Sequence, residues 1–440
     1  MRVRGLRCFG CGRVFPFRIG QYECDECGWP LEVLYDRTPP VDKRSEFVAI
    51  MERARRMWDF AALLPICREE NRVSLGEGGT PLIRLESRAV PFEGLWIKNE
   101  GLNPTGSFKD RPLSVIVSVA REWNADLLMT SSSGNAGVAL AAYSAAAGIP
   151  AVVVVPETVS EEKLVPMRLF GASVIKVRGT TSDAVKLVEK AVGHFGGRCV
   201  DATTTFRNPL GIEGDKTIAY ELIRDLGYIC PDYVIVPIGA GPLLVGIYKG
   251  FQDAYMAGVI DSIPRLVGVQ AEGCAPIAYA FQQGSSTVKA WPYPETIASG
   301  IADPLFGYEV DGAVTLRFIK DSGGYCISVA DREILSAMRL LASCAGLFAE
   351  PTGAVSMAGF LTLLAEGKLK GNEKVVCILT GQGFKEGRKV GELMDWGDVP
   401  IVGRDDDKVL LEICDDVIQK NTKGSSCQLC SQGKREEGNE

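Results

Sequence analysis

Short apolar runs rich in β-branched residues alternate with amphipathic stretches along most of this chain, and glycine, proline or capping residues separate them. The sequence predicts strands over residues 127–130, 151–155, 173–177, 233–237, 265–271 and 374–379. It predicts helices that begin near residues 110, 136 and 161, and helices over 182–192 and 244–251. This alternation indicates mostly parallel sheets covered by helices on both faces, with ligands at the carboxyl ends of the strands.

The length of 440 residues exceeds what one small core accommodates, and it predicts two or three domains. A net charge of -7 and a pI near 5.2 provide no basic field, which argues against nucleic acid and anionic lipid as partners. No apolar run approaches the roughly 20 residues of a membrane span. The arginines between Met1 and Phe9 precede no apolar segment of the signal-peptide type. We therefore expect a cytoplasmic protein without a membrane partner.

Two CxxC pairs stand near the N-terminus, Cys8 with Cys11 and Cys24 with Cys27, with twelve residues between them. Four thiolates in two such knuckles can surround one Zn²⁺ tetrahedrally and leave no position open for substrate. The alternative is four reduced or disulfide-bonded cysteines, a less common pattern inside cells at this spacing. The spacing predicts a structural zinc, and we expect residues 1–36 to form a separate zinc-ribbon-like knuckle.

The end of the chain has a different composition. Residues 403–440 are charged and then rich in Gly, Ser, Lys and Glu, which predicts a flexible tail. Cys427 and Cys430 form a third CxxC in this tail, but no second pair lies near them in the sequence. We assign no role to this thiol pair.

Lys109 stands in a run of turn-forming residues, 103–111, at the entry to the helix expected from residue 110. A lysine that is held and partly desolvated there has a lowered pKa, and its neutral amine can form an imine with an aldehyde cofactor. Most lysines are solvated surface charges, so Lys109 alone is a weak signal.

Three further loops follow predicted strands. The loop 130–137 offers hydroxyls, an amide and backbone N–H groups that can bind an anion or a ring substituent. In the loop 237–243, glycines allow the backbone to approach a phosphate at a helix N-terminus. Thr380 ends another strand, where its hydroxyl could meet a ring nitrogen or merely cap the strand. His194 is the one histidine, so no histidine triad or histidine metal site is available.

Together these segments resemble the fold-type II enzymes that use pyridoxal 5'-phosphate (PLP), and in order and spacing they are similar to the threonine synthase group. The segments that carry the resemblance are Gly76–Leu82, Gly106–Arg111, Ser133–Asn135, Glu213–Thr217 and Gly268–Gly273. The resemblance implies a two-domain α/β fold, tryptophan synthase β-like, with mostly parallel sheets. It also implies a homodimeric lyase of threonine biosynthesis that converts O-phosphohomoserine and water to threonine and phosphate.

The resemblance also assigns roles to residues. Lys109 would be the Schiff-base lysine and the catalytic proton shuttle, Asn135 would bind the ring hydroxyl of PLP, and Thr380 would meet the pyridine nitrogen. The residues expected to line the cofactor phosphate are Gly239, Ala240, Gly241, Pro242 and Leu243. The residues expected to contact an amino-acid substrate are Thr105, Ser107, Ser133 and Arg207.

In this interpretation, residues 107–201 form a small domain, residues 37–106 and 202–402 form a large PLP-binding domain, and PLP lies in the cleft between them. An alternative is a threonine or serine dehydratase, or another enzyme of β-elimination or β-replacement. It is favoured by Glu350–Ala354, which look like the dehydratases, and by Gly211, because synthases commonly carry an arginine shortly after the Asn208-Pro209 pair. A non-catalytic regulatory scaffold is a third hypothesis, disfavoured by the presence of Lys109, Asn135 and Thr380.

Overall fold

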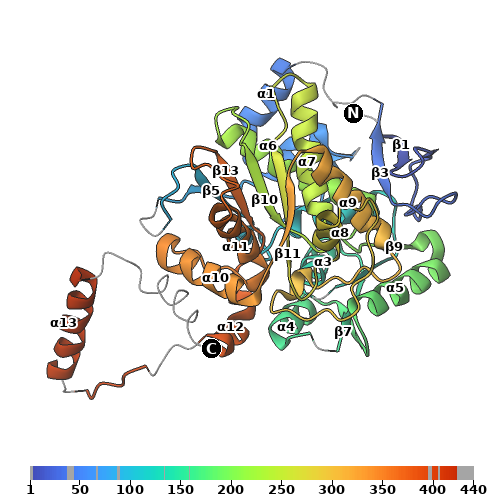
Figure 1. The fold of residues 1–440 in the computed structure, drawn as a ribbon. Coiled ribbons are helices and arrows are strands. Elements are labelled where there is room, and N and C mark those ends of the chain that lie inside the picture. The colour runs from blue at the N-terminus through green and yellow to red at the C-terminus, as the bar shows by residue number, and fades with distance from the viewer. Residues whose placement is uncertain are drawn as a thin grey trace.

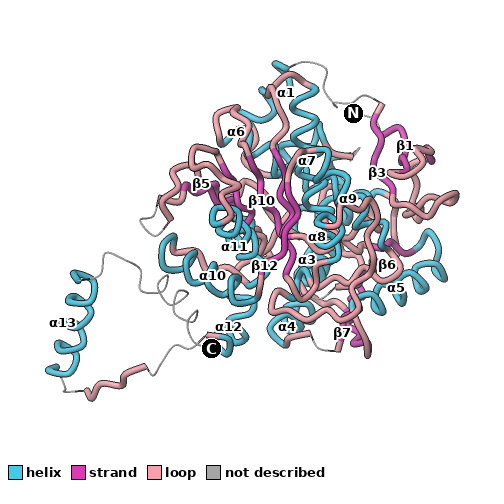
Figure 2. The backbone as a smooth tube through the Cα atoms, in the orientation of Figure 1, coloured by secondary structure: helices cyan, strands magenta, loops and turns pink. Residues whose placement is uncertain are grey.

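The computed structural model describes residues 3–36, 44–65, 68–86, 90–132, 134–157, 159–394, 399–404 and 407–423. Figure 1 shows a body built around two sheets, with a small N-terminal sheet on one side and the last helix, α13 (Asp407–Lys423), standing apart. Figure 2 shows that helices surround the strands of the body.

The larger sheet has six strands in the order β12-β11-β10-β13-β5-β4. All neighbours are parallel except β4 and β5, which pair antiparallel. Its strands are β4 (Leu82–Arg84), β5 (Leu95–Asn99), β10 (Tyr233–Pro237), β11 (Arg265–Ala271), β12 (Tyr325–Val329) and β13 (Val375–Leu379).

Alternating residues of these strands enter two separate cores. Val234 and Val236 of β10 pack into one core and Tyr233 and Ile235 into the other, because successive strand side chains point to opposite faces. The first core is covered by α1 (Arg44–Arg53), α6 (Pro209–Asp225), α7 (Pro242–Met256), α8 (Pro276–Gln282) and α9 (Glu309–Asp321). The second is covered by α10 (Asp331–Ala345), α11 (Pro351–Ala365) and α12 (Gly387–Leu393).

The smaller sheet is parallel, in the order β8-β7-β6-β9. Its strands are β6 (Leu127–Ser131), β7 (Ala151–Pro156), β8 (Ser173–Val177) and β9 (Cys199–Asp201). One face packs on α2 (Asp110–Glu122), α3 (Asn135–Ala147) and α4 (Glu161–Leu169), and the other on α5 (Thr181–Phe195). All four strands lie within the predicted small domain, whose limits stay a prediction.

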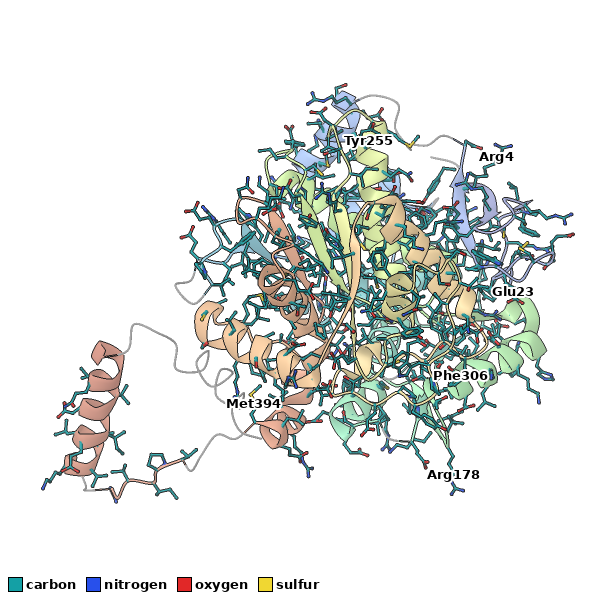
Figure 3. The ribbon with its side chains drawn as sticks, viewed as in Figure 1. Arg4, Glu23, Arg178, Tyr255, Phe306 and Met394 are labelled. Atoms are coloured by element: carbon teal, nitrogen blue, oxygen red, sulfur yellow. The ribbon has the colours of Figure 1, made fainter. Side chains whose placement is uncertain are left out.

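The N-terminal sheet is antiparallel and consists of β1 (Val3–Cys8), β2 (Val14–Phe15) and β3 (Leu31–Tyr35). Figure 3 marks it at the side of the body with the labelled side chains of Arg4 and Glu23. Two polar contacts anchor β3: Glu32 pairs with Lys249 of α7 at 3.1 Å, and the Tyr35 hydroxyl donates to Glu213 of α6 at 2.5 Å. The N-terminal unit therefore supports the α6–α7 pair.

The predicted strands and helices are observed with small shifts at their ends. Helix α7 begins at Pro242 rather than at residue 244, because proline suits the first helical turn, where its missing N–H is not needed. Within the segment expected to be a flexible tail, residues 407–423 form the helix α13, which has apolar residues at helical spacing, and the flexibility of the tail stays a prediction. Cys427 and Cys430 lie outside the described residues. No helix in the described part of the chain is long and apolar enough to cross a membrane.

Candidate active site

A cavity opens where carboxyl ends of strands from both sheets meet, next to Lys109 at the start of α2. It is lined by residues that follow β6, β9, β10 and β13 and by residues at the N-termini of α3, α7 and α11. These include Ser131, Ser132, Asn135, Thr203, Thr204, Thr205, Gly239, Ala240, Gly241, Pro242, Leu243, Asp303, Glu350, Thr352 and Thr380. The strand-end position is the one expected for a ligand in a parallel sheet.

Lys109 directs its amine into this cavity. Its Nζ donates to Thr204 Oγ1 at 2.6 Å and lies 4.7 Å from the centre of the Phe108 ring. Burial lowers the pKa of Lys109 to about 8, although the carboxyls of Asp215 and Asp303 raise it in part. At pH 7 about a tenth of the Lys109 side chains therefore carries a neutral, nucleophilic amine, far more than for a lysine with the ordinary pKa.

Part of the cavity wall carries polar atoms that lack partners. Asn135 Nδ2 donates to Glu350 Oε1 at 2.6 Å, but Asn135 Oδ1, Glu350 Oε2 and Thr380 Oγ1 are buried without a hydrogen bond. Buried polar atoms are rarely left unsatisfied in a folded protein unless a ligand supplies the partner. This wall is therefore built for a polar molecule.

The glycine loop 239–243 forms another part of the cavity wall. Gly241 adopts φ +97°, and a Cβ at this position would lie 2.4 Å from the Thr315 side chain, so only glycine fits. The loop is held by Thr315 Oγ1, which donates to the Ala240 carbonyl at 2.6 Å, and leads into the N-terminus of α7. Free N–H groups at a helix N-terminus bind phosphate well.

A model of the family described as pyridoxal-phosphate dependent enzyme matches residues 73–381, more than half of the chain. The chain belongs to this family. The threonine synthase of Methanocaldococcus jannaschii is 39% identical over 383 residues, which cover 86% of this chain and 92% of that protein. The threonine synthase of Methanosarcina acetivorans is 36% identical over 388 residues, which cover 88% of this chain and 93% of that protein. Within the family, the chain is a PLP-dependent lyase of the threonine synthase group, as the resemblance implied.

Solved structures confirm the predicted fold class. Maize serine racemase superimposes with a TM-score of 0.59 at 23% identity, covering 71% of this chain and 91% of that one. The processed form of threonine deaminase isoform 2 from Solanum lycopersicum superimposes with a TM-score of 0.57 at 22% identity. The match covers 80% of this chain and 93% of that one. At this level of identity the likeness shows the fold-type II architecture alone.

The residues of the cavity in this PLP-dependent enzyme fit its cofactor. The unpartnered Asn135 Oδ1 and Thr380 Oγ1 can hydrogen-bond to a ring, and the glycine loop leads into the N-terminus of α7, which suits a phosphate. The Lys109 amine is the one cationic group among the described residues that line the cavity.

None of the described residues that were predicted to contact substrate lines the cavity. Thr105 and Ser107 have buried hydroxyls without a partner but are not among the lining residues. Ser133 lies outside the described residues. Arg207 is paired with Asp201 at 3.2 Å and Glu189 at 3.3 Å, in a separate hollow that shares Thr205 with the cavity. The structure thus does not bring Arg207 to Lys109.

Sequence reasoning missed several lining residues. Thr203, Thr204 and Thr205 follow β9, and a run of three hydroxyls after an apolar segment could have marked them. Asp303 lies in an irregular loop, where it accepts hydrogen bonds from the Tyr308 hydroxyl at 2.7 Å and from the backbone of Leu305. Nothing in the local sequence around Asp303 indicated that it would reach Lys109.

The pKa of Lys109 predicts how PLP capture depends on pH. Only the neutral amine attacks the aldehyde, so the rate at which PLP-free enzyme captures PLP should rise about tenfold per pH unit below 8 and level off above it. In Asp215→Asn the midpoint should move to lower pH, because the Asp215 carboxyl raises the pKa of Lys109. Stopped-flow absorbance between pH 6 and pH 10 measures both rates, and a midpoint at the ordinary lysine value would contradict the assignment.

Proposed function

We propose that this PLP-dependent lyase converts O-phosphohomoserine and water to threonine and phosphate. The observation that carries the proposal is a desolvated lysine amine facing threonine hydroxyls, beside a glycine loop, in a chain 39% identical to a threonine synthase. The substrate is a small amino acid, and a homodimer stays a prediction from the resemblance.

PLP, when bound, acts as an electron sink that acidifies the substrate Cα–H and then the Cβ–H. Lys109 Nζ would be the base that takes the proton from Cα and exchanges protons at Cβ and Cγ. Thr204 Oγ1 accepts a hydrogen bond from that amine and so orients it. Overall, the Cγ–O bond to phosphate and one Cβ–H bond break, Cγ gains a proton and the water hydroxyl bonds to Cβ. The remaining water proton leaves with the phosphate, which balances the reaction.

In this proposal, Asn135 would bind the ring hydroxyl, Thr380 the pyridine nitrogen, and the loop 239–243 the cofactor phosphate. A neutral hydroxyl at the ring nitrogen keeps the ring a weaker electron sink than an aspartate would, which suits elimination chemistry. Thr380 is 2% exposed, so little solvent competes with the ring for its hydroxyl.

A dehydratase acting on unphosphorylated threonine or serine is the second candidate. The specific observation in its favour is that Lys109 is the one cation among the described residues lining the cavity, so a substrate phosphate finds no arginine there. The deciding experiment follows phosphate, threonine and 2-oxoacid together during turnover. Equal amounts of phosphate and threonine from O-phosphohomoserine support the synthase, whereas 2-oxoacid from threonine or serine would replace it with the dehydratase.

We also propose a structural zinc at the N-terminal cysteines. The sulfur atoms of Cys8, Cys11, Cys24 and Cys27 lie within 4.8 Å of one another, and the Cys8–Cys27 and Cys11–Cys24 pairs are 3.5 and 3.6 Å apart. A Zn²⁺ ion with Zn–S bonds of about 2.3 Å holds its sulfurs about 3.8 Å apart. A site of four cysteines leaves no position for substrate, so the metal would serve folding.

Removal of this zinc should lower the stability of the fold before it lowers the turnover of the enzyme. Cys27→Ser is expected to lose the metal and several kcal/mol of folding free energy, because binding energy at such sites is folding energy, on the order of 10 kcal/mol. Zinc content by atomic emission and the thermal unfolding midpoint measure this, and Cys230→Ser, outside the cluster, is the matched control. Unchanged unfolding together with lost turnover would contradict a structural role.

A further inference from the structure

Glu350 occupies the N-cap position of α11, but its side chain does not cap that helix. An N-cap side chain ordinarily accepts a hydrogen bond from the first turn of its own helix. The Glu350 carboxyl, only 1% exposed, instead accepts from Asn135 Nδ2 at 2.6 Å. The fold therefore directs this carboxyl away from its own helix and into the cavity.

The contact joins the two halves of the cavity. Asn135 begins α3, which packs on the smaller sheet, and Glu350 precedes α11, which packs on the larger one. Gly381 makes room for it: a Cβ there would lie 2.3 Å from Glu350 Oε1 and 3.3 Å from Asn135 Nδ2. The pair is thus accommodated by the loop that also carries Thr380.

Each member of the pair keeps an unsatisfied atom. Glu350 Oε2 and Asn135 Oδ1 are both buried without a hydrogen bond, and both residues line the cavity. Burying a polar atom without a partner is unfavourable, so two such atoms side by side indicate contacts reserved for a ligand.

We propose that Glu350 is a positioning residue for PLP: it accepts a hydrogen bond from one of the two Asn135 Nδ2–H groups and thereby fixes the amide that meets the ring hydroxyl. The inference rests on the proposed placement of PLP in this cavity but not on the proposed substrate. Without Glu350, the Asn135 amide is free to rotate, and the ring loses a pre-oriented partner.

The charge of Glu350 determines in which direction the pH of proton loss from bound PLP should shift when Glu350 is replaced. Burial raises the pKa of Glu350 and Glu386 raises it further, whereas Lys163 and Lys385 lower it. A carboxyl next to the ring opposes negative charge on the ring oxygen. An amide that already donates to a carboxylate is also a weaker donor and a better acceptor. Both effects favour a protonated ring, so loss of Glu350 should lower the pH at which the bound cofactor loses its proton.

The test compares Glu350→Ala and Glu350→Gln with the wild type, without substrate. Ser356→Ala is the matched control, because Ser356 lies on the same helix, is equally buried, and bonds to the Ile378 carbonyl rather than to the cavity. PLP affinity is measured by equilibrium dialysis, and the proton loss is measured from the absorbance of bound PLP against pH.

Glu350→Ala should bind PLP about tenfold more weakly, as expected for loss of one charge-assisted hydrogen bond, and its absorbance midpoint should fall. Glu350→Gln keeps an acceptor for Asn135, so its affinity should stay close to wild type while its midpoint falls as in Glu350→Ala. Ser356→Ala should change neither quantity.

Two results would overturn the inference: unchanged affinity and midpoint in Glu350→Ala, or a Glu350→Gln variant with a wild-type midpoint. If Glu350→Ala does not fold, the Glu350→Gln midpoint decides. Absence of a cofactor absorbance band from PLP-treated wild type would instead overturn the placement of PLP, whatever the variants do.

Discussion

Replacing Lys109 with alanine is expected to lower kcat by about 10³-fold or more, because the amine that captures PLP and moves the substrate protons is removed. The loss should appear in kcat rather than in protein folding, since the Lys109 side chain makes one hydrogen bond, to Thr204. Initial rates of phosphate release and circular dichroism of the same preparations measure the two effects.

Lys109→Arg is the companion variant. Arginine keeps the positive charge but does not become neutral at accessible pH, so this variant should be as inactive as Lys109→Ala. Added small primary amines should restore part of the activity of Lys109→Ala and none of that of Lys109→Arg. Activity in Lys109→Arg within tenfold of wild type would show that charge, not nucleophilicity, is what position 109 supplies.

Replacing Arg111 with methionine is expected to cost about 3–5 kcal/mol of folding free energy. Arg111 is fully buried, and its guanidinium donates to Glu100 and Glu221 at distances of 2.7 and 2.8 Å. Burial works against its charge, but these two carboxylates hold the pKa of Arg111 well above its usual value. Methionine would leave both carboxylates buried, and Lys98, 2.7 Å from Glu221, would be the cation that remains beside them among the described residues.

Urea unfolding of PLP-free protein measures this cost without a contribution from cofactor binding. Arg121→Met, on the exposed face of the same helix α2, is the matched control and should change the free energy of unfolding by less than about 0.5 kcal/mol. A cost for Arg111→Met no larger than that of the control would contradict the role of the buried ion network in holding α2, the helix that follows Lys109.

The strands that could be predicted are those whose signal is local. The runs 233–237, 265–271 and 173–177 have the predicted limits, because stretches rich in β-branched residues between turn residues define a strand locally. This holds for β10 and β11, which are buried, and also for β8, which is largely exposed. Strand β5 (Leu95–Asn99) was not predicted. Lys98 of this strand is fully buried and forms an ion pair with Glu221. Glu221 lies 123 residues away, so no local sequence pattern reveals this partner.

The residues of the candidate site also fall into two groups, those with a local sequence signal and those without one. Lys109, Asn135, Thr380 and the glycine loop stand in motifs with the right order, and the structure brings all of them to one cavity. Asp303 and Glu350 reach that cavity only because distant segments converge there. Their contribution depends on contacts such as the one between Glu350 and Asn135, which lie 215 residues apart. Arg207 had a plausible place in the sequence, but neighbouring carboxylates hold it in another hollow.

The central claim is that Lys109 is the residue that binds PLP covalently. Borohydride reduction of the PLP-loaded enzyme, followed by peptide mass spectrometry, tests it most directly, since reduction makes the bond between lysine and cofactor permanent. Lys163 and Lys385 are internal controls, because Lys163 is buried, Lys385 is partly buried, and both interact electrostatically with Glu350. The account predicts one phosphopyridoxyl group per chain, on Lys109. A label on Lys163 or Lys385, or none at all, would contradict it.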